Sequence, residues 1–429
     1  MYDKNIDEYM IKNKKKKILV CGLGPVGGFF VTYLTYKFND DFEIIVYDPK
    51  LGEFSRKQIL TLQPLILDMI ETNLPKIIFE KMVKIGCYVH NPEKAADAKC
   101  YVHETKDKYL SIRTMDIEMI FYEYIKENLP KVKLFKRELS KSRTVLRDEL
   151  KTYDYCISAT GGRDKLGELI GNKYKKEKLS NGMIITFDPK RHKIYDNESE
   201  EMDKHVKKMM IQNRYRGYKS KRNNYYIGVQ LGDNEIDELQ KFVEEKGEIT
   251  YKNMPEHLFI IIKNGLMKYE MEDNIKMNTL NVSFFPIIRK YSTVPADYIN
   301  KKSKDLPIIF MVGDSLTTPH FFSGMGVNSG FKMAYTLINL LKSKNNKDNN
   351  KDNNRDNDMI LKVYNKMAKQ QITEIGKWAK IVSVDMDKVD DMCQKYTKKD
   401  IYQLAKHNKL VSENMSKREV CLSLNRIMK

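Results

Sequence analysis

The sequence predicts an α/β protein with three parts: a layered domain of parallel strands and helices, a mixed-sheet domain, and a helical C-terminal region. Three observations predict this architecture. Near the N-terminus an apolar run is followed by the turn Gly22-Leu23-Gly24-Pro25-Val26-Gly27. A second apolar run, much later in the chain, leads into another glycine-rich segment, residues 313–328. Between the two glycine segments, strand-like runs recur over residues 182–291.

The first glycine segment has the order strand, tight turn and helix that a dinucleotide site requires. The apolar run 17–21 precedes the glycines, and a helix-like run, 29–34, follows them. Gly22 permits the turn, Gly24 lets the backbone approach a pyrophosphate, and Gly27 lets the helix pack against the strand. We therefore expect the turn, including Val26, to contact a dinucleotide.

An acidic residue follows the next predicted strand. The apolar run 42–47 ends at Asp48, about twenty residues beyond the glycines, where dinucleotide-binding units place a carboxylate. Such a carboxylate accepts hydrogen bonds from the hydroxyl groups of an adenosine ribose. The strand, turn, helix and acid agree, so the sequence predicts a Rossmann-like domain with Asp48 as the ribose ligand.

The late glycine segment has a related form. The apolar run 306–312 ends at an acid, and after a short loop a glycine turn opens an apolar helix pattern that extends to Leu341. A strand that delivers a carboxylate beside a helix N-terminus can hold a polyol hydroxyl group and present backbone N–H groups to an electron-rich ring. The expected contacts in this segment are Gly313, Asp314, Gly324, Gly326, Val327 and Asn328.

With this Gly-Asp motif the sequence resembles the class A flavoprotein monooxygenases, the group that contains para-hydroxybenzoate hydroxylase. The resemblance implies an FAD-binding domain in which Asp314 contacts the ribityl chain. Residues 53–64 and 110–117 are similar to two motifs of the MICAL flavoprotein oxidoreductases, which implies Arg56 and Arg113 as further FAD contacts. Arginine also suits a pyrophosphate because its fork pairs with phosphate oxygens. The alternative for each arginine is a solvated charge on a helix face.

The segment 155–166 departs from the family pattern. Thr160 stands where the family has the aspartate of an Ala-Asp-Gly motif. Because threonine cannot supply the charge of a carboxylate, we expect slow reduction by NADH or NADPH but retained FAD binding.

The resemblance implies an FAD-dependent oxidoreductase, a monooxygenase that activates O2 at the flavin and takes reducing equivalents from NAD(P)H. Its substrate, a small molecule or a protein, is expected near Pro319, Phe321 and Phe322. Residues 182–291 show no Ser-His-Asp arrangement for hydrolysis, so the chemistry is expected from the cofactor. The alternative is a flavin-fold scaffold with structural FAD, whose basic C-terminal helices bind nucleic acid or a partner protein. Thr160 favours the scaffold, and the glycine motifs favour the enzyme.

The same patterns divide the chain into six segments. They are a basic leader (1–16), the first part of the FAD-binding domain (17–181), the substrate domain (182–291), the second part of the FAD-binding domain (292–342), a low-complexity linker (343–358) and a helical C-terminal region (359–429). In the substrate domain we expect strands at 183–187, 225–230, 257–262 and 280–285 and a helix at 234–246. A long amphipathic helix is expected from Leu361 to Val382.

The net charge of +18 favours acidic partners, although lysine is abundant along the whole chain. Two capping boxes, at 397–400 and 416–419, predict a pair of short C-terminal helices that looks like SAP or Rho-N modules. Such a basic pair suits contact with nucleic acid or with an acidic protein surface, and a docking hairpin is the alternative.

Cysteine usage predicts reduced thiols and a cytoplasmic protein. The six cysteines are scattered, no secretory signal is recognisable, and no apolar run approaches the ~20 residues of a membrane span. The repeated segments 87–90 and 100–103, both Cys-Tyr-Val-His, hold residue types that bind zinc. Their alternation is equally typical of paired strands, so no metal is assigned.

Overall fold

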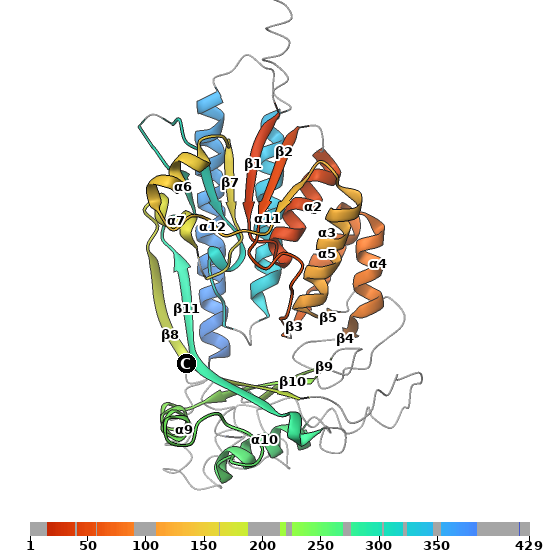
Figure 1. The fold of residues 1–429 in the computed structure, drawn as a ribbon, viewed down its shortest axis with the longest axis vertical. Coiled ribbons are helices and arrows are strands. Elements are labelled where there is room, and N and C mark those ends of the chain that lie inside the picture. Colours follow the sequence, from red (N-terminus) through yellow and green to blue (C-terminus); the bar gives the residue numbers. More distant parts are fainter. Residues whose placement is uncertain are drawn as a thin grey trace, which may run out of the picture.

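The computed structural model describes residues 15–38, 41–56, 58–89, 109–162, 164–187, 215–219, 225–268, 276–302, 304–320, 324–345, 353–383 and 420. These residues form an upper layer of parallel strands and helices and a lower antiparallel layer, joined by two long strands (Figure 1).

The upper layer is built on a six-stranded sheet with the order β12-β13-β7-β1-β2-β6. All neighbouring strands are parallel except β12 and β13. The strand bounds are β1 (Lys16–Cys21), β2 (Phe42–Tyr47), β6 (Lys133–Phe135), β7 (Tyr155–Ser158), β12 (Ala296–Tyr298) and β13 (Ile308–Met311). The central strands are continuous apolar runs because helices cover both faces of a parallel sheet. The predicted α/β fold class is confirmed.

Strand order places the residues of interest on one edge. The chain passes from β1 to β2 on one side, and β7 and β13 lie on the other side of β1. A crevice forms at such a switch point, outside the carboxyl ends of the strands. Gly22, Asp48, Ala159 and Val312 directly follow β1, β2, β7 and β13, so all the predicted acids and turns reach this edge.

Helices α2 (Pro25–Phe38) and α11 (Met325–Asn345) pack against each other on one face of the sheet. Their contact is aromatic: the ring centroids of Phe29 and Phe331 lie 4.9 Å apart, and Tyr33 stacks on Tyr335 at 5.5 Å. Helix α5 (Thr114–Asn128) lies on the other side of α2. The opposite face of the sheet packs on α6 (Arg143–Leu150) and α7 (Lys165–Leu169).

A small antiparallel sheet, β3-β5-β4, lies beside these helices. Its strands are β3 (Ile59–Leu62), β4 (Cys87–Val89) and β5 (Tyr109–Arg113), and α3 (Pro64–Asn73) and α4 (Lys76–Ile85) connect β3 to β4. The second predicted MICAL-like motif spans the end of β5 and the start of α5.

The lower layer is an antiparallel sheet with the order β11-β8-β10-β9. Its strands are β8 (Tyr174–Phe187), β9 (Tyr215–Lys219), β10 (Tyr225–Leu231) and β11 (Asn281–Ser292), and its helices are α9 (Asp233–Lys246) and α10 (Glu256–Lys268). The predicted strands at 183–187, 225–230 and 280–285 and the helix at 234–246 are confirmed.

The prediction of a strand at 257–262 is wrong, because this segment lies in α10. Leu258, Ile261 and Ile262 are buried against the lower sheet, whereas Phe259 and Ile260 are exposed. This spacing is that of a helix, and a short apolar run rich in isoleucine cannot be assigned to a strand by composition alone.

Helix α12 (Asn353–Val382) confirms the predicted amphipathic helix but begins inside the predicted linker. Two residues of that linker have partners elsewhere in the upper layer, one on β7 and one in the loop between β12 and β13. Asn357 accepts a hydrogen bond from the hydroxyl group of Tyr155 at 3.0 Å, and Asp358 pairs with Lys304 at 2.8 Å. Tertiary contacts therefore extend the helix into a segment without apolar residues.

Apart from Val420, the predicted C-terminal helix pair lies outside the described residues, as do His90, Cys100, His103, Phe321 and Phe322. Within the described ranges, each helix is too short or too polar to cross a bilayer.

Candidate functional site

The first glycine turn follows β1 and can be formed only with glycine at two positions. Gly22 has a positive φ of 96° and donates a backbone hydrogen bond to Tyr47 at 2.8 Å. A Cβ atom on Gly27 would lie 2.0 Å from the carbonyl oxygen of Gly22, so any side chain there would push helix and strand apart.

Gly24 differs from its neighbours because its missing side chain faces a pocket. A Cβ atom there would have only side-chain atoms within 4 Å, Oε1 of Glu118 at 3.7 Å and Nη1 of Arg56 at 4.0 Å. The protein would therefore tolerate alanine at position 24, whereas a ligand lying against the backbone would not.

The two glycine segments meet at Val26. A Cβ atom on Gly313 would lie 3.2 Å from the Cγ2 atom of Val26, and one on Gly330 would lie 2.4 Å from the same methyl group. The packing of α2 on α11 thus brings the beginnings of both helices together. Because the first N–H groups of a helix have no intrahelical acceptor, both beginnings offer donors to an anion or an electron-rich ring.

Asp48 joins the first turn to the residues after β2. Its Oδ2 atom accepts a hydrogen bond from the backbone N–H of Leu23 at 2.6 Å, and its Oδ1 atom accepts one from Lys50 at 2.7 Å. The half-buried carboxylate is thereby fixed beside the glycine turn, and it keeps acceptor capacity for ligand hydroxyl groups.

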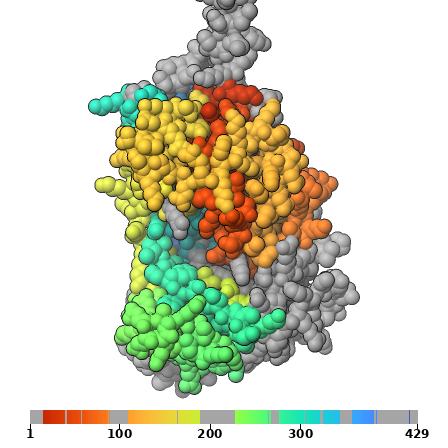
Figure 2. All heavy atoms as spheres, in the orientation of Figure 1, coloured from red at the N-terminus to blue at the C-terminus, as the bar shows by residue number. Residues whose placement is uncertain are grey.

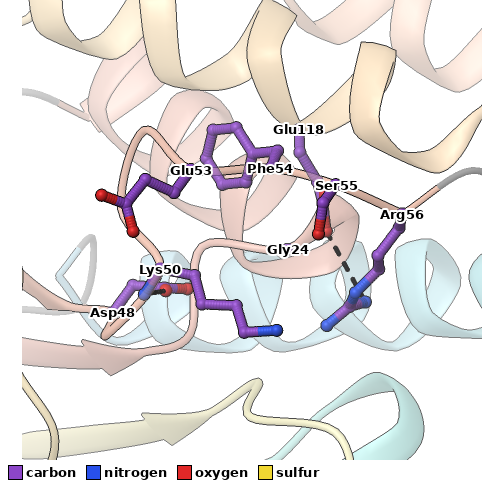
Figure 3. A pocket seen from close by; sticks show the side chains of 8 residues that line it. All are labelled: Gly24, Asp48, Lys50, Glu53, Phe54, Ser55, Arg56 and Glu118. Atoms are coloured by element: carbon purple, nitrogen blue, oxygen red, sulfur yellow. Dashed lines mark hydrogen bonds and ion pairs between the residues drawn. The ribbon is translucent and has the colours of Figure 1, made fainter.

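Figure 3 shows the pocket beside Gly24. Its lining residues are Gly24, Asp48, Lys50, Glu53, Phe54, Ser55, Arg56 and Glu118. The side chains of Lys50 and Arg56 extend into the same space, and the carboxyl group of Glu118 faces Arg56. The pocket therefore offers two cations next to a helix beginning, which suits a diphosphate.

Glu118 is the buried acid of this pocket. Its side chain is 3% exposed, and its Oε1 atom lies 3.6 Å from Nη1 of Arg56, whose side chain is 57% exposed. Desolvation raises the pKa of Glu118 to about 7, with a further increase from Asp48, although Arg56 and Lys50 act in the opposite direction. Glu118 therefore titrates near neutral pH.

Asp314 lies in the short 3-10 turn η4 (Gly313–Ser315) after β13. The residue is exposed at the carboxyl edge of the parallel sheet. Desolvation raises the pKa of its carboxyl group, and the positive charge of Arg56 opposes the shift. Arg56 thus acts on both Glu118 of α5 and Asp314 of the late glycine segment.

Pro319 and Gly326 lie next to Asp314. A Cβ atom on Gly326 would be 3.2 Å from Cγ of Pro319 and 3.7 Å from Oδ1 of Asp314. The predicted substrate residue Pro319 is therefore adjacent to the predicted ribityl contact. Val327 follows in the first turn of α11.

The side chains of two predicted cofactor residues bind other groups of the protein. Arg113 forms a buried bidentate pair with Asp116, at 2.7 and 2.9 Å, and is not among the residues that line the pocket. The amide of Asn328 donates to Thr61 and Gly324, and its oxygen accepts from the backbone N–H of Gln63 at 2.9 Å. These side chains hold β3 and β5 in place beside the helices.

Thr160 belongs to a network of buried and half-buried hydroxyl groups. Its Oγ1 atom lies 3.3 Å from Oγ of Ser158 and 3.4 Å from Oγ of Ser315. Ser158 donates to Asp164 at 2.6 Å, and Tyr174 reaches both Asp164 and the carbonyl oxygen of Ser315. The network fixes η4, and it contains a carboxylate four residues after the position at which the family motif has one.

Sequence reasoning missed Lys50 and Glu118. Lys50 follows Asp48 in a turn and has no motif of its own. Glu118 carries a weak signal, since it is a charged residue beside the apolar positions Ile117, Ile120 and Phe121 of α5. Only the packing of α5 on α2 shows that this charge faces the glycine turn.

The space-filling view shows the molecule hollowed on one face, between the upper layer in red to orange and the lower layer in green (Figure 2). The carboxyl edge of the parallel sheet and the lower sheet thus lie on opposite sides of a recess.

The residues at this edge fit FAD. Gly24 leaves room for a phosphate, the beginnings of α2 and α11 provide N–H donors, and Asp48 and Asp314 provide acceptors at two separated points. An elongated dinucleotide carries its hydroxyl-bearing ribose and ribityl groups on either side of a diphosphate, which matches this order of donors and acceptors.

Comparison with known proteins supports the fold. No family model and no curated protein sequence matches the chain. Among solved structures, a mutant of PqsL from P. aeruginosa is 12% identical, with a TM-score of 0.55 over 86% of this chain and 96% of that one. CtdE in complex with FAD and a substrate is 11% identical, with a TM-score of 0.56 over 87% and 89%. CmlS, a flavin-dependent halogenase, is 10% identical, with a TM-score of 0.56 over 97% and 77%. The chain therefore shares the fold of these flavin-dependent proteins.

Proposed function

We propose that the protein is an FAD-dependent oxidoreductase of the class A monooxygenase type. One observation carries the proposal: the two glycine segments meet at Val26, so that Asp48, Gly24 and Asp314 lie along one edge of the sheet. Proteins that share this fold and bind FAD, such as CtdE, support it.

Each residue along the edge has a distinct role in the proposal. Asp48 accepts hydrogen bonds from the adenosine ribose, and Gly24 with the beginning of α2 receives the diphosphate. Arg56 and Lys50 neutralise the phosphate charge. Asp314 accepts from the ribityl chain, and the first N–H groups of α11, at Gly326 and Val327, face the flavin ring.

When bound and reduced, FAD supplies the reaction with O2, and the protein positions the substrate and excludes water. Pro319 forms part of the substrate wall on the side of the parallel sheet. The antiparallel sheet of β8, β10 and β11 forms the opposite wall across the recess (Figure 2). The substrate is a small molecule or a protein. Closeness to the MICAL branch rests on the motifs around Arg56 and Arg113.

Purified protein tests the proposal directly. We expect a yellow protein that carries one non-covalent FAD per chain, and apoprotein whose melting temperature rises on addition of FAD, because a ligand of the native state stabilises it. Absence of both a flavin spectrum and any thermal stabilisation by saturating FAD would reject the proposal.

The scaffold function remains the second candidate, and Thr160 favours it. In this alternative FAD is structural, and the basic C-terminal helices bind nucleic acid or an acidic partner. Anaerobic addition of NADPH or NADH separates the candidates. Slow or absent bleaching of the flavin favours the scaffold, whereas rapid bleaching favours the monooxygenase and shows that the Thr160 network supports reduction.

A further inference from the structure

The pocket beside Gly24 contains a carboxyl group at the place where a dinucleotide would put its negatively charged diphosphate. Oε1 of Glu118 lies 3.7 Å from the place where a Cβ atom on Gly24 would be. A phosphate that uses the space left open by Gly24 therefore comes into contact with this carboxyl group. An ionised carboxylate at that distance repels a phosphate, most strongly where little water screens the two charges.

The surroundings of Glu118 favour its neutral, protonated form. The side chain is almost fully buried, and among the described residues its ion-pair partner is Arg56 at 3.6 Å. The other charged groups of the pocket are Asp48, Lys50 and Glu53, from the segment after β2. Near the beginning of its own helix, Asp116 is paired with Arg113 of β5. Desolvation raises the pKa of Glu118 to about 7, and Asp48 adds to the increase, against the opposing effect of Arg56 and Lys50.

We propose that Glu118 binds the cofactor as a neutral acid and donates a hydrogen bond to a phosphate oxygen. Arg56 leaves Glu118 and pairs with the phosphate instead. Cofactor binding therefore takes up one proton. In the free protein Arg56 pairs with ionised Glu118. When the diphosphate enters, the guanidinium group, which is more than half exposed, turns to the phosphate. Glu118 then takes a proton from solvent, which offsets one of the two negative charges of the diphosphate. This inference rests on the proposed FAD site.

Proton uptake can be measured without any enzyme assay. FAD is titrated into apoprotein by calorimetry at pH 8 in two buffers of different ionisation enthalpy, and the difference in binding heat gives the protons taken up. We expect about one proton per FAD for the unmodified protein, because at this pH most Glu118 is ionised before binding. The dissociation constant should be roughly tenfold higher at pH 8 than at pH 6, since only the protonated fraction is competent to bind.

Two variants provide the matched comparison. Glu118→Gln keeps the shape and a hydrogen-bond donor but cannot titrate, so it should bind FAD with pH-independent affinity and no proton uptake. Glu53→Gln removes a carboxylate that lines the same pocket but is 68% exposed and pairs with Lys136. This control should keep the uptake of one proton.

Binding of a second ligand shows which half of FAD causes the proton uptake. ADP-ribose shares the adenosine diphosphate half of FAD and has no group of its own that titrates between pH 6 and pH 8. It should cause the same proton uptake as FAD. Uptake with FAD but not with ADP-ribose would place the titrating group at the flavin end and overturn the inference.

The other outcomes are also decisive. Affinity for FAD that does not change between pH 6 and pH 8 in the unmodified protein, or uptake that persists in Glu118→Gln, contradicts the role of Glu118 but leaves the FAD site intact. If neither FAD nor ADP-ribose binds even at pH 6, the proposed function itself fails. The measurement on the unmodified protein decides the question even where a variant does not fold.

Discussion

At the scale of single residues, the glycines of the first turn have separate tasks. Gly27 is required by the fold, because a Cβ atom would lie 2.0 Å from the carbonyl oxygen of Gly22. Gly24 is required only by the ligand, since the nearest atoms to its missing side chain are 3.7 Å away. The two positions therefore separate folding from binding.

Alanine substitutions test this separation. Gly27→Ala should lower the free energy of unfolding by about 1–3 kcal/mol or more, through overpacking of helix against strand. Gly24→Ala should leave stability unchanged and weaken FAD binding at least tenfold. Urea denaturation and FAD titration of both variants make the comparison. Equal loss of stability in the two variants would contradict the assignment of Gly24 to the ligand.

Asp314 gives a second prediction at this scale. Asp314→Ala removes a charge-assisted hydrogen bond of about 1.5–3 kcal/mol, so FAD affinity should fall by roughly ten- to a hundredfold. Asp314→Asn keeps an acceptor oxygen and should lose less. Fluorescence titration of apoprotein with FAD measures both constants, and an unchanged constant for the alanine variant would remove Asp314 from the ribityl contact.

Glu118 also affects the stability of the protein without ligand. Because its pKa is raised from 4.5 to about 7 in the folded state, its stabilising contribution is complete below pH 4.5 and is lost as the pH rises through 7. The loss amounts to about 3.5 kcal/mol at most, since one pKa unit corresponds to about 1.4 kcal/mol. Glu118→Gln should therefore stabilise apoprotein relative to the unmodified chain at pH 8 but not at pH 4. Urea denaturation at the two pH values measures the difference, and an equal difference at both would refute the raised pKa.

At the scale of elements, one side chain fixes helix α12 to the edge of the parallel sheet. Oδ1 of Asn365 accepts from the backbone N–H of Ala296 at 3.0 Å, and its Nδ2 donates to the carbonyl oxygen of Ala296 at 2.9 Å. The amide thus satisfies both ladder groups of one residue in the edge strand β12. Strand edges with unpaired groups favour pairing with other chains, so this contact also protects the sheet.

Asn365→Ala should destabilise the protein by about 2 kcal/mol, because two hydrogen bonds are lost and two partly buried backbone groups are left without partners. Asn365→Asp keeps the acceptor but places an oxygen against the carbonyl of Ala296, so it should be no more stable than the alanine variant. Chemical denaturation of the three proteins gives the order of their stabilities. A neutral alanine variant would show that water replaces the amide at no cost.

The elements also show what could be predicted from the sequence. The turn around Gly22 and the acids after β2 and β13 were predictable because their conformations are set locally by glycine and by strand ends. Helix α10 was missed because over a few residues its apolar run fits the spacing of a helix and that of a strand equally well. The pairing of Arg113 with Asp116 and the burial of Glu118 depend on packing between distant segments, which a single sequence does not reveal.

At the scale of the whole molecule, β8 and β11 connect the two layers. Their pairing is continuous from Tyr174 with Ser292 in the upper layer to Thr186 with Asn281 in the lower sheet, with one bulge at Ile287 and Ile288 (Figure 1). Tyr174 is also tied to the network of Asp164 and Ser315. The two layers are therefore joined by a continuous strand pair rather than by a flexible linker.

The continuous strand pair predicts cooperative unfolding. We expect a single calorimetric transition for the apoprotein, and a shift of the whole transition to higher temperature on addition of FAD, since unfolding of either layer removes the contacts that hold one end of this strand pair. Two transitions, of which only one moves with FAD, would show that the layers unfold independently.

The methyl group of Val26, enclosed by Gly313 and Gly330, has a consequence for how this protein can diverge. A larger residue at position 26, or a side chain at either glycine, closes the same gap from a different part of the chain. Substitutions in the two segments are therefore not independent, and a change in one is tolerated only with a compensating change in the other. A chimera that takes residues 17–38 from a distant homologue should fold only when its residues 313–330 come from the same parent.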